Sequence, residues 1–234
     1  MNSRLFVLFL SLILLTSCGP DKKINTDPGA AYFDYMIWGD EESGLVTVKL
    51  QYRSGGPNGE SFRLDEGAKV ELDGESLKAD TAGLNGTYYE LIKSVPDFAG
   101  KHIVRTTGKD GKFYQVEFDF IPIVLKTQVP PVVGRDSLIL DLEGLQPRDT
   151  VRVLLTDTSF YGNGIEHLGR LQKGRAVIRH FGDLQTGPVF AEFTKEQLIP
   201  LKASKGGGIL SVTYGLKREF MLADSVRTGS LNSP

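Results

Sequence analysis

The chain has 234 residues and a formal net charge of −2 at neutral pH, from 27 basic and 29 acidic side chains. This near balance excludes a general electrostatic attraction to nucleic acid, which requires clustered basic charge. A single cysteine excludes an internal disulfide, so the fold must be stabilised by packing alone.

The N-terminus has the pattern of a secretory signal peptide. Residues 5–15 read LFVLFLSLILL, an apolar run interrupted by a single serine. A membrane-spanning helix needs roughly 20 apolar residues, so this run is too short to span the bilayer. Its length and its positive flank fit the apolar region of a signal peptide. We therefore predict that residues 1–17 are removed on export.

The residues that follow, Leu15-Thr16-Ser17-Cys18, resemble the lipobox of bacterial lipoproteins, which is an aliphatic residue, two small residues and a cysteine. In that family the cysteine thiol receives diacylglycerol, the signal peptide is cut before it, and the new amine is acylated. The resemblance implies that Cys18 is the lipidated first residue of the mature chain. Several acyl chains anchor a protein stably, whereas one is marginal. A free structural cysteine is the alternative.

Residues 18–30 predict a flexible tether, because they combine two prolines, two glycines and four charges with no apolar period. An aspartate directly after the cysteine retains enteric lipoproteins at the inner membrane, and here that position holds Gly19. The resemblance therefore implies the outer membrane, with the periplasmic and surface faces both open. Surface lipoproteins of the Bacteroidota often carry an acidic cluster after the cysteine, which this chain matches only at Asp21.

Residues 31–124 alternate short strands with turn signals. The dipeptide Asp73-Gly74 within KVELDGESLK predicts a tight hairpin. Residues 102–121 predict two strands around Gly108–Gly111. In the second of these strands, one face carries the apolar side chains and should pack inward; these are Tyr114, Val116, Phe118 and Phe120.

Pro130-Pro131 cannot lie in a central strand, so residues 125–133 predict a linker between domains. Strands resume in residues 134–227, and residues 228–234 predict a disordered tail. The segment Thr194–Ile199 predicts either a short helix or a loop, since Thr194 is a suitable N-cap and Pro200 follows.

Strand-and-loop patterns recur in the two halves with an offset of about 101 to 105 residues, which is close to the size of one sandwich module. The predicted fold class is therefore all-β, with two tandem immunoglobulin-like β-sandwiches after the signal peptide and tether. This organisation implies that cutting the chain at Pro130-Pro131 gives two folded halves. A single large sandwich is the alternative.

No catalytic motif stands out. The three histidines, His102, His167 and His180, lie in no H-E-x-x-H motif and are expected at surface or strand-end positions. The segment Gly39–Gly44 clusters three consecutive carboxylates, whereas a calcium loop alternates its ligands, so we interpret it as a solvated turn. Neither a metal nor a cofactor is predicted.

Aromatic residues in loops are the best binding candidates. Phe160 and Tyr161 follow a predicted strand and precede Gly162-Asn163-Gly164, and loop aromatics on a rigid sandwich give contact area at low entropic cost. The alternative is that Phe160 folds back to close the end of the sandwich. Trp38 is interpreted as a core residue of the first strand.

The sequence thus favours a non-enzymatic lipoprotein of the bacterial cell envelope, similar to those of the Bacteroidota, with a lipid anchor in the membrane. It would act as a binding or scaffolding module for envelope proteins or glycans, and nucleic acid is not an expected partner. The alternative is a glycan-active enzyme or accessory subunit with a cleft between its two domains. A third possibility is a spacer with no specific partner.

Overall fold

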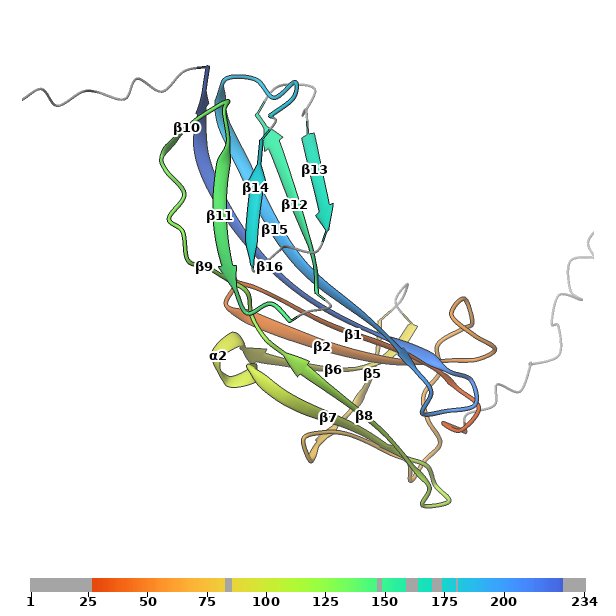
Figure 1. Ribbon diagram of the computed structural model, residues 1–234. Coiled ribbons are helices and arrows are strands. Elements are labelled where there is room, and N and C mark those ends of the chain that lie inside the picture. Colours follow the sequence, from red (N-terminus) through yellow and green to blue (C-terminus); the bar gives the residue numbers. More distant parts are fainter. Residues whose placement is uncertain are drawn as a thin grey trace, which may run out of the picture.

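The computed structural model describes residues 27–82, 86–146, 149–158, 164–169, 174–179 and 181–224. Within these ranges the chain forms sixteen strands and one short helix (Figure 1). In chain order they are β1 (Tyr32–Asp40), β2 (Leu45–Arg53), β3 (Lys69–Leu72), β4 (Glu75–Leu77), β5 (Ala79–Ala82), β6 (Gly86–Ser94), α2 (Val95–Phe98), β7 (Gly100–Thr107), β8 (Phe113–Phe120), β9 (Val124–Leu125), β10 (Val132–Gly134), β11 (Leu138–Glu143), β12 (Thr150–Asp157), β13 (Gly164–Gly169), β14 (Arg175–Ile178), β15 (Gly187–Leu201) and β16 (Gly208–Ala223). The all-β prediction is confirmed. Among these residues no helix has the length and apolarity to cross a membrane.

A large sheet of nine strands is covered on one face by two smaller sheets. Its strands lie in the order β13-β12-β15-β16-β1-β2-β6-β5, and β10 also pairs with β16. The small sheets have the orders β4-β3-β7-β8 and β14-β11-β9. Figure 1 shows β7 and β8 beneath β1 and β2 in one lobe, and β11 and β14 over β12 and β15 in the other. The predicted sandwich architecture is therefore confirmed.

The long hairpin of β15 and β16 belongs to both sandwiches. The first half of β16, Gly208–Gly215, pairs in parallel with β1, while Val189–Glu196 of β15 pairs with β12 of the other sandwich. A 16-residue strand spans roughly 50 Å, which is long enough to cross both lobes (Figure 1). The large sheet is therefore continuous from one lobe to the other.

Side chains on a single face of β16 enter both cores. The Tyr214 ring lies 5.9 Å from that of Phe120 on β8, and the Phe220 ring lies 6.4 Å from that of Phe181, which follows β14. Even-numbered residues of a strand share one face, and Tyr214 and Phe220 are both buried. One alternating pattern thus serves two hydrophobic cores.

Strand pairing crosses the boundary that the sequence predicts at residues 125–133. Residues of the segment 134–227 complete the sheet that contains β1, and the predicted linker itself contains parts of β9 and β10. Pro130-Pro131 directly precedes β10, whose residue Val132 pairs with Met221 of β16. Independent folding of the two segments stays a prediction, and this pairing argues against it.

A buried lysine lies where the two sandwiches meet. The Lys195 ammonium on β15 donates to the carbonyl oxygens of Ile121 at 2.6 Å and Gly144 at 3.1 Å, and it lies 3.3 Å from a carboxylate oxygen of Asp149. Asp149 is also buried and accepts from the backbone N–H of Gln146. Burial lowers the pKa of Lys195, which the Asp149 carboxylate partly opposes. Ile121 follows β8 and Gly144 follows β11, so Lys195 connects the segments that leave the two small sheets.

The predicted helix or loop at Thr194–Ile199 is wrong, because the segment lies inside strand β15. Phe193 and Lys195 point into the protein while Glu196 is exposed, so the period is two. Beyond Glu196 no pairing with β12 continues, and an edge position tolerates the proline that follows. The short helix α2 was not predicted, although Ser94 caps it by accepting from the Asp97 N–H at 3.3 Å.

Local turn and face predictions are confirmed in the first lobe. Leu72 pairs with Glu75 across the Asp73-Gly74 turn, and both turn residues have positive φ, of 52° and 85°, as a two-residue hairpin loop requires. Strands β7 and β8 flank the predicted Gly108–Gly111 turn. On β8 the predicted inward face is buried at its last three positions, with Tyr114 half-buried.

Three buried hydroxyl groups tie the two sheets of this lobe together. The Tyr52 hydroxyl lies 2.6 Å from Thr106 Oγ1, and the Tyr35 hydroxyl lies 3.2 Å from both. Burial raises the pKa of Tyr35 to about 12 and that of Tyr52 well above its usual value. Tyr35 and Tyr52 come from the large sheet and Thr106 from β7, so the cluster bridges the sandwich.

Replacing Thr106 with valine should lower the free energy of unfolding by about 1–3 kcal/mol, because buried hydroxyls lose a partner without a compensating gain. Urea denaturation measures the change. Thr107→Val on the same strand makes the same chemical change at a less buried position and should stay within about 0.5 kcal/mol. Equal losses in both variants would show that the hydroxyl cluster does not matter.

Candidate functional site

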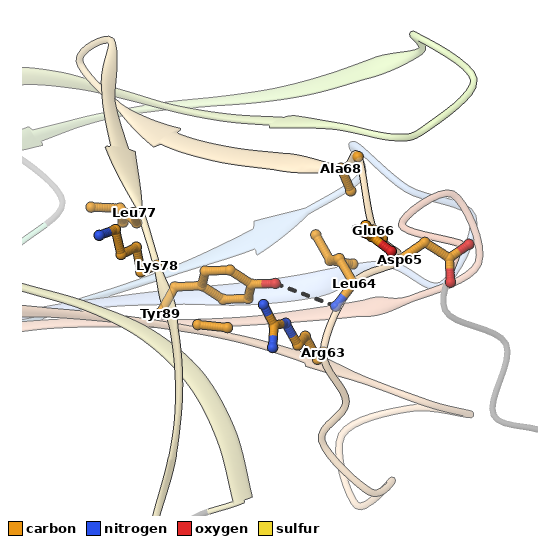
Figure 2. Close-up of a pocket in the computed structure, with 10 residues that line it drawn as sticks. Arg63, Leu64, Asp65, Glu66, Ala68, Leu77, Lys78 and Tyr89 are labelled. Atoms are coloured by element: carbon orange, nitrogen blue, oxygen red, sulfur yellow. Dashed lines mark hydrogen bonds between the residues drawn. The ribbon is translucent and has the colours of Figure 1, made fainter.

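An open cleft of about 780 Å³ lies at the side of the first sandwich. It is lined by residues from the connection between β2 and β3, from the β4–β5 crossing and from β6; these are Arg63, Leu64, Asp65, Glu66, Gly67, Ala68, Leu77, Lys78, Ala79 and Tyr89. Figure 2 shows Leu77 and Lys78 on one side of the cleft, with Leu64 and Glu66 facing them and Tyr89 between.

The chain forms this cleft where it passes between sheets. Leu77 ends β4 of the small sheet and Ala79 begins β5 of the large sheet, so Lys78 alone connects the two. On the opposite side the chain between β2 and β3 makes the same passage. It is fixed at its start by Arg53, whose guanidinium binds Asp34 at 2.6 Å and the Gly59 carbonyl at 3.3 Å.

The floor of the cleft is apolar except for one phenol. Leu64, Leu77 and Tyr89 are buried, and the Tyr89 ring packs edge-on against Tyr52 with centroids 5.6 Å apart. The Tyr89 hydroxyl accepts the backbone N–H of Leu64 at 3.3 Å, the dashed line in Figure 2. Burial raises the pKa of Tyr89, while the Leu64 N–H and Arg63 act to lower it.

The rim of the cleft is charged. Asp65 forms an ion pair with Lys109 at 2.6 Å. Arg63, Glu66 and Lys78 are exposed, and none of them has a hydrogen bond or ion pair with another residue of the described part of the chain. These side chains are therefore available to a ligand, over a floor that offers apolar contact.

A second, smaller groove lies on the open face of the large sheet. It measures about 320 Å³ and is lined only by polar side chains, which are Thr150, Arg152, Glu166, Thr194, Glu196 and Thr213. The pairing places Glu166 opposite Leu154 and Glu196 opposite Thr150. Two strand spacings and four residues separate their backbones by roughly 16 Å.

Trp38 lies on the exposed face of β1, so its assignment to the core is wrong. It is 41% exposed and pairs with Thr213, one of the lining residues. Its neighbours Phe33, Tyr35 and Ile37 fill the inner face of β1, which leaves position 38 on the outer face.

His102 lies near the start of β7, in agreement with the expected strand-end position, but it is buried and not at the surface. Its Nδ1 lies 2.7 Å from Asp73 Oδ2, its Nε2 lies 2.5 Å from the Phe98 carbonyl oxygen, and its ring stacks on that of Phe98 at 3.9 Å. Both ring nitrogens face acceptors, so neither is open to a substrate. The contact of His102 with Asp73 holds the β3–β4 turn against β7, and its contact with Phe98 holds the end of α2 there.

Several predicted sites lie outside the described residues. These are Cys18, Phe160, Tyr161, His180, the side chain of His167 and the tail at 228–234. The segment Gly39–Gly44 is described, and its acidic residues form the predicted solvated turn between β1 and β2. Glu41 of this turn binds Arg218 on β16. The described residues contain no group of three or more potential metal-ligating side chains.

The cleft was not predicted from the sequence. Tyr88 and Tyr89 are adjacent in β6 and so face opposite ways, and Tyr89 is the buried one. Nothing local marks Arg63 as its neighbour, because Arg63 lies in the connection between β2 and β3 whereas Tyr89 lies within β6. An isolated arginine before an apolar residue and an acidic pair, as in RLDE, carries no recognised motif.

Comparisons with known proteins identify no family. No family model matches the chain, and no curated protein does. Among solved structures it is similar to the I-band fragment I67-I69 from titin, at 14% identity and a TM-score of 0.29, over 82% of this chain and 65% of that one. It is also similar to Escherichia coli alpha-2-macroglobulin activated by porcine elastase, at 15% identity and a TM-score of 0.30, over 83% and 20%.

A third similar structure is DIP-gamma IG1+IG2, at 10% identity and a TM-score of 0.23, over 82% of this chain and 94% of that one. The chain thus spans less than two thirds of the first two similar structures. TM-scores of this size do not establish a shared arrangement, so the sandwich architecture rests on the strand pairing.

Proposed function

We propose that the chain is a non-enzymatic binding or scaffolding protein of the bacterial cell envelope, held at the membrane by lipid on Cys18. The observation that carries the binding function is the cleft beside Tyr89. Its size falls within the range of ligand sites, and it joins an apolar floor to unpaired charges at Arg63, Glu66 and Lys78. Its partner is an envelope protein or a glycan.

The anchor is supported by the signal peptide, by the lipobox-like Leu15-Thr16-Ser17-Cys18 and by the tether after it. Because Gly19 follows the cysteine, we assign the protein to the outer membrane. Residues 18–26 extend to roughly 30 Å at most, so the tether would keep the folded part close to the lipid surface.

Asp27, the first described residue, lies near the rim of the cleft. Asp27 is close enough to Lys109 to raise its pKa, although the dominant cause is the hydrogen bond from Lys109 to Asp65 on the cleft rim. The chain from Asp27 therefore begins beside the loop that holds the rim. A ligand in the cleft would be bound near the membrane surface.

Replacing Cys18 with serine should reduce incorporation of labelled fatty acid to background and release the protein from the membrane fraction, because serine provides no thiol for diacylglycerol. Metabolic labelling with fractionation measures both. Ser17→Ala is the matched control, since it keeps a small residue before the cysteine and should be lipidated normally. Fatty acid in the Cys18→Ser protein would refute the lipoprotein proposal.

A further inference from the structure

The Tyr89 hydroxyl accepts a hydrogen bond but donates none to a described residue. Only 6% of the residue is exposed, and its oxygen accepts from the Leu64 N–H. No acceptor for its own proton occurs among the residues that the structure describes. Buried polar groups in native proteins are nearly always hydrogen-bonded, so this donor, on the wall of an open cleft, is suited to an acceptor atom from a ligand.

Arg63 adds a second set of donors at the same place. Figure 2 shows its guanidinium beside the hydroxyl end of Tyr89, and its charge acts on the Tyr89 phenol. Arg63 is exposed and pairs with no carboxylate in the described ranges. A guanidinium presents parallel N–H groups that match the two oxygens of a carboxylate, so Arg63 and Tyr89 together offer three donors.

The charge around the cleft favours a singly charged anion. Arg63 and Lys78 line it together with Asp65 and Glu66, and Lys109 neutralises Asp65. With Asp65 paired to Lys109, the lining keeps two unpaired cations, Arg63 and Lys78, against one unpaired carboxylate, Glu66. In Figure 2 the Lys78 ammonium points away from Tyr89, so Arg63 is the cation closest to the buried donor.

We propose that the cleft binds the carboxylate of a small organic acid. Arg63 holds the two oxygens as a fork, the Tyr89 hydroxyl donates to one of them, and the apolar body of the acid packs on Leu64 and Leu77. The proposal rests on the cleft being a binding site, as proposed above, and goes beyond it by giving the cleft a small-molecule ligand besides an envelope protein or glycan partner. It adds that the selecting feature is the pair of Arg63 and Tyr89.

Calorimetric titration of the full lipidated chain in non-ionic detergent tests this ligand class. The probes are isovalerate and benzoate, their neutral amides, and phenyl phosphate. Arg63→Gln should weaken carboxylate binding about tenfold or more, because a charge-assisted hydrogen-bonded pair is lost. Lys78→Gln removes the same charge from the same cleft but away from Tyr89, and should weaken binding less than about threefold.

Tyr89→Phe removes the donor and should weaken binding by about threefold to tenfold. Because it also leaves the Leu64 N–H without its acceptor, Arg63→Lys serves as an independent variant that keeps the charge and loses the fork. Arg63→Lys should bind carboxylates more weakly than wild type and more tightly than Arg63→Gln.

Carboxylate binding that depends on Arg63 supports the proposal. Equal affinity for acids and amides, no binding of any acid, or equal losses for Arg63→Gln and Lys78→Gln would overturn it. Tighter binding of phenyl phosphate than of benzoate would overturn the assignment to carboxylates. None of these outcomes affects fatty-acid labelling at Cys18, so a failure here is distinguishable from a failure of the lipoprotein proposal.

Discussion

A chain that ends at Gly134 is expected to lack a stable fold, although it contains all of the predicted first sandwich. It loses the segment Gly208–Gly215, which pairs with β1 along its whole length. Leu210, Val212 and Tyr214 leave the core, and each fully buried side chain of this kind contributes about 1.5–3 kcal/mol. Their sum approaches the whole stability of a typical domain, about 5–15 kcal/mol.

Circular dichroism with urea denaturation measures this loss. The matched control joins residues 27–134 through a flexible linker to residues 207–216, which restores the strand beside β1 and should restore a cooperative transition. A cooperative transition of residues 27–134 alone would instead support the two independent modules that the sequence predicts.

Replacing Lys195 with methionine should lower the free energy of unfolding by about 3–5 kcal/mol. Methionine fills a similar volume, but it leaves the buried Asp149 carboxylate without a counter-charge and two carbonyl oxygens without their donor, and breaking a buried ion pair from one side has a cost of this size. Thermal and urea denaturation of the full chain measure it.

Adding Asp149→Asn to Lys195→Met should recover part of the lost stability, because the unpaired buried charge is removed. Lys217→Met is the matched control. Lys217 is exposed on β16 and lies 3.6 Å from Glu42, so its loss should change stability by no more than about 0.5 kcal/mol. A Lys195→Met cost as small as that of Lys217→Met would show that the buried pair does not hold the two sandwiches together.

Local features of this fold were predictable from the sequence. The Asp73-Gly74 turn needs positive φ at both positions, which these residue types tolerate, and the alternation of residues 113–120 selects one inward face. Both depend on neighbours within a few residues. The exposed position of Trp38 follows from the same alternation in β1, because Phe33, Tyr35 and Ile37 fill the inner face.

The shared hairpin was not predictable in this way. A strand with period two has the same pattern whichever strand lies beside it, so residues 208–222 read as one strand without indicating that β1 and β15 are both its partners. Lys195 also made β15 hard to predict as a strand, because a charged side chain at an inward position breaks the apolar alternation. Its buried partner Asp149 lies 46 residues earlier in the chain, and only the fold joins them.

The cleft was not predictable either, because its residues are distant in the sequence. Arg63 and Tyr89 are separated by three short strands, and neither belongs to a motif. Their relation arises because the chain passes from one sheet to the other on both sides of Tyr89's strand. The sequence around Cys18 therefore indicates where this protein is expected to work, but no motif indicates which residues would contact a ligand.

Binding at the cleft is tested most directly by the ring resonances of ¹³C-labelled tyrosine in the full chain, with Tyr89 assigned through Tyr89→Phe. Addition of isovalerate should shift the Tyr89 resonance in a saturable manner. Tyr35, whose hydroxyl is held in the buried cluster with Thr106, should not shift and provides the internal control. An unchanged Tyr89 resonance, or equal shifts at Tyr35 and Tyr89, would contradict the binding of a carboxylate in the cleft.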